Sequence, residues 1–272
     1  MPFFRIIMPN YNNSEWLEKS IGSVLDQTFT DYHFIFVDDK STDNSLEKFG
    51  EITRKINTGA RISWTIATEK AWNGGARNLG IKYGTWPQKE SEYTLFLDSD
   101  DWFASPDVLQ KLHDFIVDRD YPNCVRLPFE IFYDGNKRLP VMLNDATPES
   151  LVDSIFVACW TKCIRSDLVV PFPENTLMED VVQHIKQCDV LSTIEPFDEL
   201  AVIYNKNNTN SCSSEQNQDL QHGKWQSSMF RYMADLLDLE LQHDYCVKHR
   251  DWRAEICLKN IKNDVYSQSI IK

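Results

Sequence analysis

Short apolar runs alternate with amphipathic segments over the first part of the chain. The runs are long enough to form buried strands and occupy residues 3–8, 34–37, 62–66 and 93–97. The segments between them predict a helix over residues 16–25 with Ser14 as its N-cap, a helix after the polar turn 41–45, and a helix over 76–83 after a break at Asn73-Gly74-Gly75. This alternation predicts an α/β fold with a mixed, mostly parallel sheet flanked by helices.

The second half of the chain is less regular. A helix is expected from Ser105-Pro106 to about Arg119, and further elements are expected at residues 125–133, 138–143, 147 onward, 156–164, 181–188 and 200–204. The polar loop 205–218 is the best candidate boundary, and amphipathic helices are expected beyond it at 220–241 and 245–262. The predicted organisation is a domain over residues 1–206, with halves 1–103 and 104–206, followed by a helical C-terminal extension over 207–272.

The composition is that of an ordinary globular protein, since 42% of the 272 residues are hydrophobic and 25% are charged. No apolar stretch is long enough to predict a membrane-spanning helix, and the N-terminal residues lack the pattern of a signal peptide. The seven cysteines are scattered, without a CxxC pair. This usage favours reduced thiols and a cytoplasmic location.

The net charge of −13 makes nucleic acid a poor default partner, because an acidic chain repels phosphate backbones. The charge is distributed unevenly. Residues 145–200 carry 11 acidic and 3 basic side chains, whereas residues 244–272 carry 6 basic and 4 acidic ones. A basic surface for a membrane or for phosphates is therefore expected only on the last predicted helix.

An acidic cluster, Asp98-Ser99-Asp100, follows the fourth predicted strand. Residues i and i+2 of an extended segment share a face, so both carboxylates point the same way. Paired carboxylates repel unless a cation lies between them, and Mg²⁺ or Mn²⁺ commonly bridges such groups to substrate phosphates. The structural alternative is an acidic turn in which Asp101 caps the next helix.

A second acidic pair, Asp38-Asp39, ends the second predicted strand. One carboxylate could accept a hydrogen bond from a nucleotide base, or both could simply cap the following turn. Tyr11, on the loop after the first strand, could stack on a base or pack at the edge of the core. Ligands of parallel α/β sheets bind beyond the carboxyl ends of the strands, so these positions predict a nucleotide-type site.

Two further segments are weak signals when taken alone. The stretch Asn73 to Asn78 combines two glycines with Arg77, whose forked cation suits phosphate, but it could equally be a plain start of a helix. Glu179-Asp180 opens a predicted helix. A carboxylate there could act as a general base, or it could merely be favoured by the helix dipole.

Taken together, these motifs resemble those of the family 2 glycosyltransferases, which are inverting enzymes with a GT-A fold. The resemblance rests on ordered stretches of this chain: IMPNYN at 7–12, LEKSIGSVLDQTF at 17–29, FVDDKSTDNS at 36–45, NGGARNLG at 73–80 and FLDSDDW at 96–102. Similarity is weaker at WTKCIRS, residues 160–166, and at MED, residues 178–180. The chain departs from the family pattern at Lys40, where a small residue is common, and in its short loop at residues 73–75.

The resemblance implies a nucleotide-sugar site and a catalytic base. A donor sugar, most often linked to UDP, would be held by Pro9, Tyr11, Asp38, Asp39, Arg77, Asp98 and Ser99. Mn²⁺ or Mg²⁺ would be bound by Asp100 together with Asp98. Asp180 would deprotonate the acceptor hydroxyl in a single displacement with inversion.

The acceptor is expected to be a surface polysaccharide or another glycan. The alternatives are transfer to a hydroxymethylated base of phage-type DNA, and a nucleotide-sugar binder without catalysis. Nucleotidyl transfer is disfavoured because residues 9–13 contain no Gly, Lys or Arg. The two C-terminal helices also offer a surface for a homo-oligomer.

Overall fold

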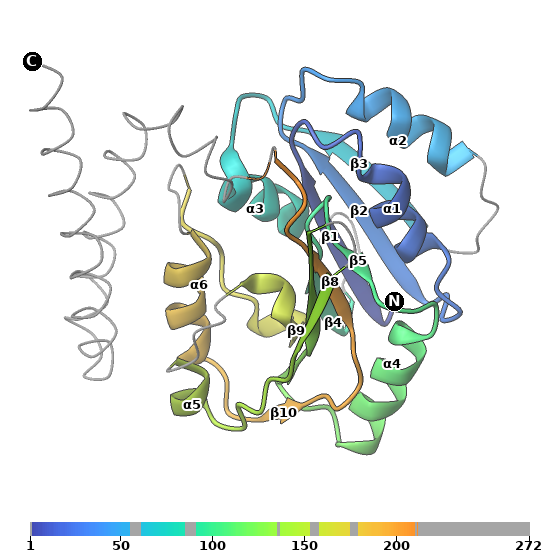
Figure 1. The fold of residues 1–272 in the computed structure, drawn as a ribbon. Helices are drawn as coiled ribbons and strands as arrows, with labels where there is room; N and C mark the ends of the chain where they lie inside the picture. The colour runs from blue at the N-terminus through green and yellow to red at the C-terminus, as the bar shows by residue number, and fades with distance from the viewer. Residues whose placement is uncertain are drawn as a thin grey trace, which may run out of the picture.

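Two sheets and the helices packed around them make up the described part of the chain (Figure 1). The computed structural model describes residues 2–54, 61–84, 91–134, 137–152, 158–174, 179–209 and 211. The larger sheet has the strand order β10-β6-β9-β4-β1-β2-β3, and the smaller has the order β5-β11-β7-β8. In the larger sheet only β9 runs antiparallel to its neighbours, so the predicted mixed, mostly parallel sheet is confirmed.

The strands are short and follow the apolar runs closely. Those of the larger sheet are β1 (Phe4–Asn10), β2 (Tyr32–Asp38), β3 (Arg61–Ile66), β4 (Tyr93–Phe96), β6 (Cys124–Arg126), β9 (Lys162–Arg165) and β10 (Ile194–Pro196). Those of the smaller sheet are β5 (Trp102–Phe103), β7 (Phe129–Tyr133), β8 (Lys137–Val141) and β11 (Val202–Asn205). Every residue of β1, β2 and β4 is buried, which explains why these strands read as continuous rather than alternating apolar runs.

Helices cover both faces of the larger sheet. They are α1 (Leu17–Leu25), α2 (Ser45–Arg54), α3 (Trp72–Gly84), α4 (Val108–Asp118), α5 (Pro148–Val152) and α6 (Glu179–Cys188), with short 3₁₀ turns at Cys159–Thr161 and Ser166–Leu168. Alternate residues of β1 enter different cores: Phe4, Ile6 and Met8 pack with α1, α2 and α4, whereas Ile7 packs with α3. A β-carbon at Gly80 would lie 2.4 Å from Ile7 Cγ2, so this glycine lets α3 approach β1 closely.

Two local predictions in the first half are wrong. Asn73-Gly74-Gly75 does not break the chain but lies in the first turns of α3, which begins at Trp72. Ser14 does not cap α1, because that helix begins at Leu17 and Trp16 occupies the N-cap position without a side-chain bond. The backbone N–H of Ser14 instead donates to Asp43 Oδ2 in the neighbouring loop. In both cases tertiary partners override the local capping signal.

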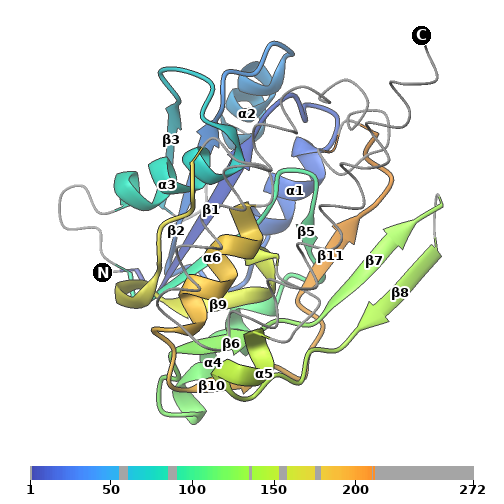
Figure 2. The ribbon, with the colours of Figure 1, turned by 90° about the vertical axis from the view of Figure 1, so that its left-hand side faces the viewer.

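The second half shows further corrections. The helix predicted from Ser105-Pro106 begins at Val108, and the run predicted as one strand at 125–133 is divided into β6 and β7, which belong to different sheets. The chain between them contains Pro128, which lacks the N–H that a continuous ladder needs. Strand β7 then pairs with β8 in a hairpin that extends from the body (Figure 2). The helices predicted at 220–241 and 245–262 lie outside the described residues.

The four described cysteines, Cys124, Cys159, Cys163 and Cys188, are buried and free. This agrees with the reduced state expected for them. Within the ranges that the structure describes, no helix is long and apolar enough to cross a membrane.

Candidate active site

The parallel strands β1, β2 and β4 end at one edge of the larger sheet, and each end carries a polar segment. Asn10 pairs with Asp38 in the register of β1 and β2, and Asp98 follows β4. The parallel pairing therefore brings together segments that are far apart in the chain, as the strand pattern predicts.

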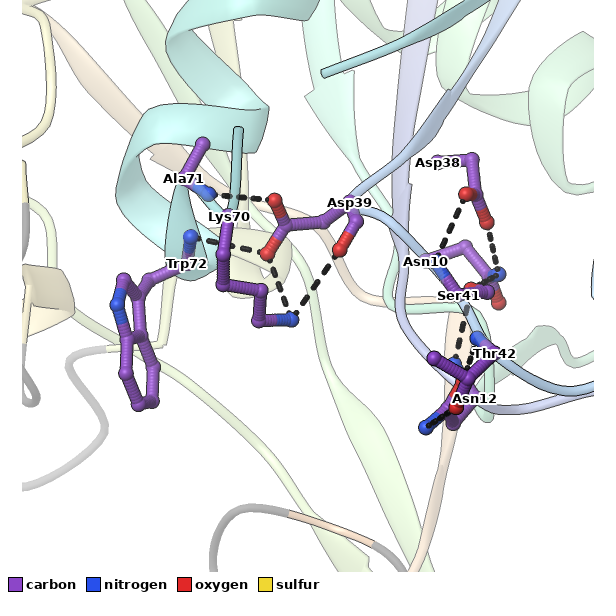
Figure 3. Close-up of polar contacts among 9 residues, drawn as sticks. All are labelled: Asn10, Asn12, Asp38, Asp39, Ser41, Thr42, Lys70, Ala71 and Trp72. Carbon is purple, nitrogen blue, oxygen red and sulfur yellow. Dashed lines mark hydrogen bonds and ion pairs between the residues drawn. The ribbon is translucent and has the colours of Figure 1, made fainter. Parts of the chain in front are cut away.

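Asp38 is fully buried, and its carboxylate stabilises the turn after β2 (Figure 3). Its Oδ1 accepts a hydrogen bond from Asn10 Nδ2 at 3.0 Å, and its Oδ2 accepts one from the Ser41 backbone N–H at 3.0 Å. Within that turn Lys40 has a φ of 63°, in the left-handed region that favours glycine. Lys40 therefore has a strained backbone conformation at a position where the family that the sequence resembles commonly has a small residue.

Asp39 is also buried, but its carboxylate faces the start of α3 (Figure 3). It accepts hydrogen bonds from the backbone N–H groups of Ala71, at 2.6 Å, and Trp72, at 2.9 Å. Lys70 Nζ lies 2.8 Å from Asp39 Oδ2. The first N–H groups of a helix have no partner within the helix, so Asp39 supplies the N-terminal cap of α3 from another strand.

Lys70 links this carboxylate to Tyr11. Its Nζ lies 2.8 Å from the centroid of the Tyr11 ring, so the ammonium covers one face of that ring. Tyr11 remains 41% exposed, whereas Pro9 is buried in β1 opposite Val37. Of the residues expected at the base, Tyr11 is thus the one that presents a ring to solvent.

The segment after β4 is held by a network of amides. Asn13 Nδ2 donates to Ser99 Oγ at 2.8 Å, and Asn208 Nδ2 donates to Asp100 Oδ2 at 2.7 Å and to Asn13 Oδ1 at 2.9 Å. Asp101 is buried and accepts from the backbone N–H of Asn205 at 2.8 Å, so it anchors β11 rather than capping α4.

Asp98 and Asp100 have the donor chemistry of a site for a hard divalent cation. Burial, and then the charge of Asp98, raise the pKa of Asp100 to about 6. A bound cation would oppose this rise by stabilising the ionised carboxylate. No group of three or more His, Cys, Asp or Glu side chains that could hold a metal occurs in the described segments. The cation expected at Asp98 and Asp100 would thus depend on the oxygen-donor chemistry of these two carboxylates, with its remaining ligands from donor phosphates and water.

Arg77 lies in α3, and its guanidinium links Asp98, after β4, to the Glu179-Asp180 pair at the start of α6. Its guanidinium is 1% exposed and contacts three carboxylates: Nη2 lies 2.7 Å from Asp98 Oδ1, and Nη1 lies 2.6 Å from Glu179 Oε1 and 3.1 Å from Asp180 Oδ1. Despite burial, these neighbouring negative charges raise its pKa, so the guanidinium stays charged. Arg77 thus faces carboxylates in this structure.

Gly74 allows α3 to come this close to α6. A β-carbon at Gly74 would lie 2.3 Å from the Pro173 carbonyl oxygen and 3.3 Å from Glu179 Cβ. The sequence stretch at residues 73–77 therefore combines a glycine for close helix packing with an arginine that reaches the first turn of α6.

Three features lie at one edge of the sheet: a carboxylate pair suited to a cation, a second carboxylate pair at the start of a helix, and an arginine that links them. Together they have the chemistry for group transfer from a diphosphate. Residues 5–158 match glycosyl transferase family 2. The chain belongs to this family.

Its curated relatives include proteins of cell-surface polysaccharide synthesis. The chain is 33% identical over 181 residues to the poly(ribitol-phosphate) beta-N-acetylglucosaminyltransferase TarS of Staphylococcus aureus, covering 63% of this chain and 30% of TarS. It is 34% identical over 117 residues to an uncharacterized glycosyltransferase of Haemophilus influenzae, covering 43% of each. The matches thus span less than half the length of these relatives.

Solved structures confirm the GT-A fold. The first 349 residues of S. aureus TarS in complex with UDP-GlcNAc match 86% of this chain and 66% of that one, with a TM-score of 0.66 and 23% identity. A mannosyltransferase from Pyrobaculum calidifontis, in complex with GDP-Man and Mn²⁺, matches 87% of this chain and 64% of that one, with a TM-score of 0.58 and 13% identity.

Sequence reasoning missed several residues of the site. Lys70 lies in a stretch without strand or motif character, and Asn208 falls in the segment assigned to the C-terminal extension. Asn208 did have a usable signal, because it comes three residues after Asn205, where the last strand ends. That strand end lies at the edge that carries the other polar segments. No local signal identifies Lys70, because its partners Asp39 and Tyr11 come from other loops.

Proposed function

We propose that this protein is an inverting glycosyltransferase that moves a sugar from a UDP-linked donor to an acceptor hydroxyl. The observation that carries the proposal is the position of Asp180, which shares one guanidinium with Asp98 although the two residues belong to different halves of the fold. A base for the acceptor and a carboxylate for the donor therefore face the same point.

The donor is assigned to the edge formed by β1, β2 and β4. Tyr11 offers its exposed ring to the base, and Asp39 accepts a hydrogen bond from the base with the lone pairs that the helix cap leaves available. Asp98 and Ser99 lie toward the ribose and the sugar. Asp38, fully buried, supports the turn that carries this surface.

The leaving group gains negative charge as the bond to the sugar breaks. When bound, Mn²⁺ or Mg²⁺ supplies electrostatic stabilisation of that charge on the diphosphate, and Asp100 with Asp98 would hold it. The side chain of Asp180 is 25% exposed, so its carboxylate is open to an incoming hydroxyl. It takes the hydroxyl proton as the oxygen attacks the anomeric carbon from the face opposite the leaving group.

The acceptor is assigned to the class of cell-surface glycans. Three named relatives support this: TarS acts on poly(ribitol-phosphate), a second protein is named for minor teichoic acid synthesis in Bacillus subtilis, and a third, from Escherichia coli, is named for transfer of glucose to alpha-D-GlcNAc-diphosphoundecaprenol. No described feature favours the alternatives of a DNA acceptor or a binder without catalysis. Transfer in the cytoplasm, and a homo-oligomer formed by the C-terminal helices, stay predictions.

The test uses the full chain with UDP-Glc, UDP-GlcNAc, UDP-Gal and GDP-Man, each with Mn²⁺ or with EDTA. Binding is scored by thermal shift, because a ligand at 100 times its Kd adds about 2.7 kcal/mol of stability. Transfer to poly(ribitol-phosphate) is followed by nuclear magnetic resonance of the anomeric proton, and an inverted product is expected from a UDP-sugar. Retention of configuration, or binding of no nucleotide sugar, would overturn the proposal.

A further inference from the structure

Arg77 is a buried cation at the centre of the site, and three carboxylates surround its guanidinium. It contacts Asp98, Glu179 and Asp180 at 2.6 to 3.1 Å, while its Nε has no hydrogen-bond partner among the described residues. Burying a charge costs free energy, and a buried ion pair is often no better for stability than apolar packing. Its placement therefore needs a reason other than stability.

The three carboxylates around Arg77 are not equivalent. The side chain of Glu179 is only 8% exposed, whereas those of Asp98 and Asp180 are 27% and 25% exposed. Glu179 also has the shortest contact with the guanidinium. Glu179 thus serves as the interior partner, and the two aspartates form the face that the arginine presents to substrates.

The helix that carries Arg77 is held in place at its start. The close contacts at Gly74 hold the first turn of α3 against Pro173 and Glu179. Asp39, which lies where the nucleotide base is proposed to bind, caps the start of the same helix. The guanidinium is therefore fixed relative to both ends of the proposed donor site, and its two amino groups fix the separation between Asp98 and Asp180.

We propose that Arg77 is a positioning residue for transfer: it aims the Asp180 carboxylate at the acceptor, with Glu179 as its interior partner. This inference rests on the proposed function, and it assigns Arg77 a role that differs from direct contact with the donor base or phosphate. A single guanidinium suits it because the planar fork reaches carboxylates on two sides, whereas the point charge of a lysine does not.

The groups around Asp180 define the electrostatic side of this role. Burial raises the pKa of Asp180 above its ordinary value, and the charge of Asp98 adds to this rise. Arg77 and Lys162, from α3 and β9, oppose the rise, as does the Cys159 thiol through a hydrogen bond. Glu179, on the same helix, repels Asp180, and burial followed by this repulsion raises the pKa of Glu179 itself to about 7. Removing Arg77 should therefore raise the pKa of Asp180 further.

The experiment compares R77Q, R77K and E179Q in the full chain, with R119Q as a control that removes an exposed arginine paired to Glu195. The pH profile of kcat is measured with Mn²⁺ and donor at saturation. R77Q is expected to lower kcat by about 10²-fold, the cost of a misplaced catalytic group, and to move the acidic limb to higher pH. R77K should recover part of kcat, and E179Q should leave the acidic limb in place, because Glu179, with a pKa of about 7, is already neutral at that limb. The donor KM should change less than kcat in each.

A shift of the acidic limb in R77Q separates positioning from a structural role, since simple destabilisation would lower kcat without moving the limb. If R77Q keeps kcat within threefold of wild type and an unchanged limb, the inference is wrong. If R77Q fails to fold, R77K decides, and a wild-type kcat with an unchanged limb in that variant overturns the inference. Failure of the proposed function looks different: wild type would show no transfer, or D180N would keep the wild-type rate.

Discussion

Two acidic clusters lie at the same edge of the sheet, and they are neutralised in different ways. The Asp38 and Asp39 cluster is satisfied by backbone N–H groups, Asn10 and Lys70. In the second cluster Asp98, Glu179 and Asp180 share the guanidinium of Arg77, and Asp100 accepts a hydrogen bond from the amide of Asn208. Carboxylates with protein partners on both oxygens chiefly build the framework, with only spare lone pairs left at Asp39 for the base, whereas under-neutralised ones are available for a cation or a proton. The comparison therefore separates scaffold from chemistry within one acidic edge.

The largest effect is expected from D180N, which removes the proposed base while keeping the size of the side chain. Loss of general-base catalysis should lower kcat by about 10³-fold and leave the donor KM nearly unchanged. Steady-state kinetics with the best donor measures this. D167N is a matched control, because Asp167 is an exposed aspartate paired with Arg165. Equal activity of D180N and wild type would erase the distinction between the two clusters.

The next effect concerns the cation. EDTA, or the substitution D100N, should reduce transfer by about 10²-fold, because the charge that develops on the leaving diphosphate loses its stabilisation. Binding of Mn²⁺ in the presence of UDP, followed by electron paramagnetic resonance, should weaken in D100N and stay normal in D43N. Unchanged Mn²⁺ binding in D100N would show that the cation binds in another part of the site.

D39N tests the framework cluster. The amide keeps one acceptor oxygen but loses the charge and one of the two contacts with the start of α3, so the free energy of unfolding should fall by about 1–2 kcal/mol, as for other lost caps. Chemical denaturation measures this. D180N should cost less stability than D39N, because Asp180 is partly exposed and the loss of its charge also removes repulsion with Asp98 and Glu179. The reverse order would contradict the assignment of scaffold and chemistry.

The pH dependence of stability should also differ between the clusters. Burial raises the pKa of Glu179 to about 7 from an ordinary 4.5. The folded state then binds more protons than the unfolded state between these values, so this group lowers stability as pH rises from about 4.5 to 7. E179Q removes that decline, and its melting temperature relative to wild type should increase over this window. A difference that is constant with pH would show that Glu179 is not perturbed.

The smallest effect is expected from K70M. Lys70 is about one third exposed, and exposed ion pairs contribute little, so the free energy of unfolding should change by less than about 1 kcal/mol. If the donor base stacks on Tyr11, it must share that ring with Lys70. The donor KM should therefore change more than kcat, and Y11A is the matched variant that should raise KM. Wild-type KM values in both variants would place the base elsewhere.

Much of the fold could be predicted because it depends on local patterns. Continuous apolar runs identified β1, β2 and β4, since strands buried on both faces need apolar residues at every position. The strand ends then located the acidic segments after Phe36 and Phe96. Predictions that relied on single capping residues were less reliable: Ser14 and Asn73-Gly74-Gly75 were assigned wrongly, because packing against other segments determines where those helices begin.

The sequence alone determined the α/β order, the parallel core and the presence of carboxylates at one edge of the sheet, because each depends on the spacing of residues along a short segment. Only the tertiary structure decided which carboxylates are neutralised. Asp39 meets the start of α3, Arg77 reaches α6 across about a hundred positions of sequence, and Asn208 returns to Asp100. Such partnerships arise from how the elements pack, and no local pattern of charges encodes them.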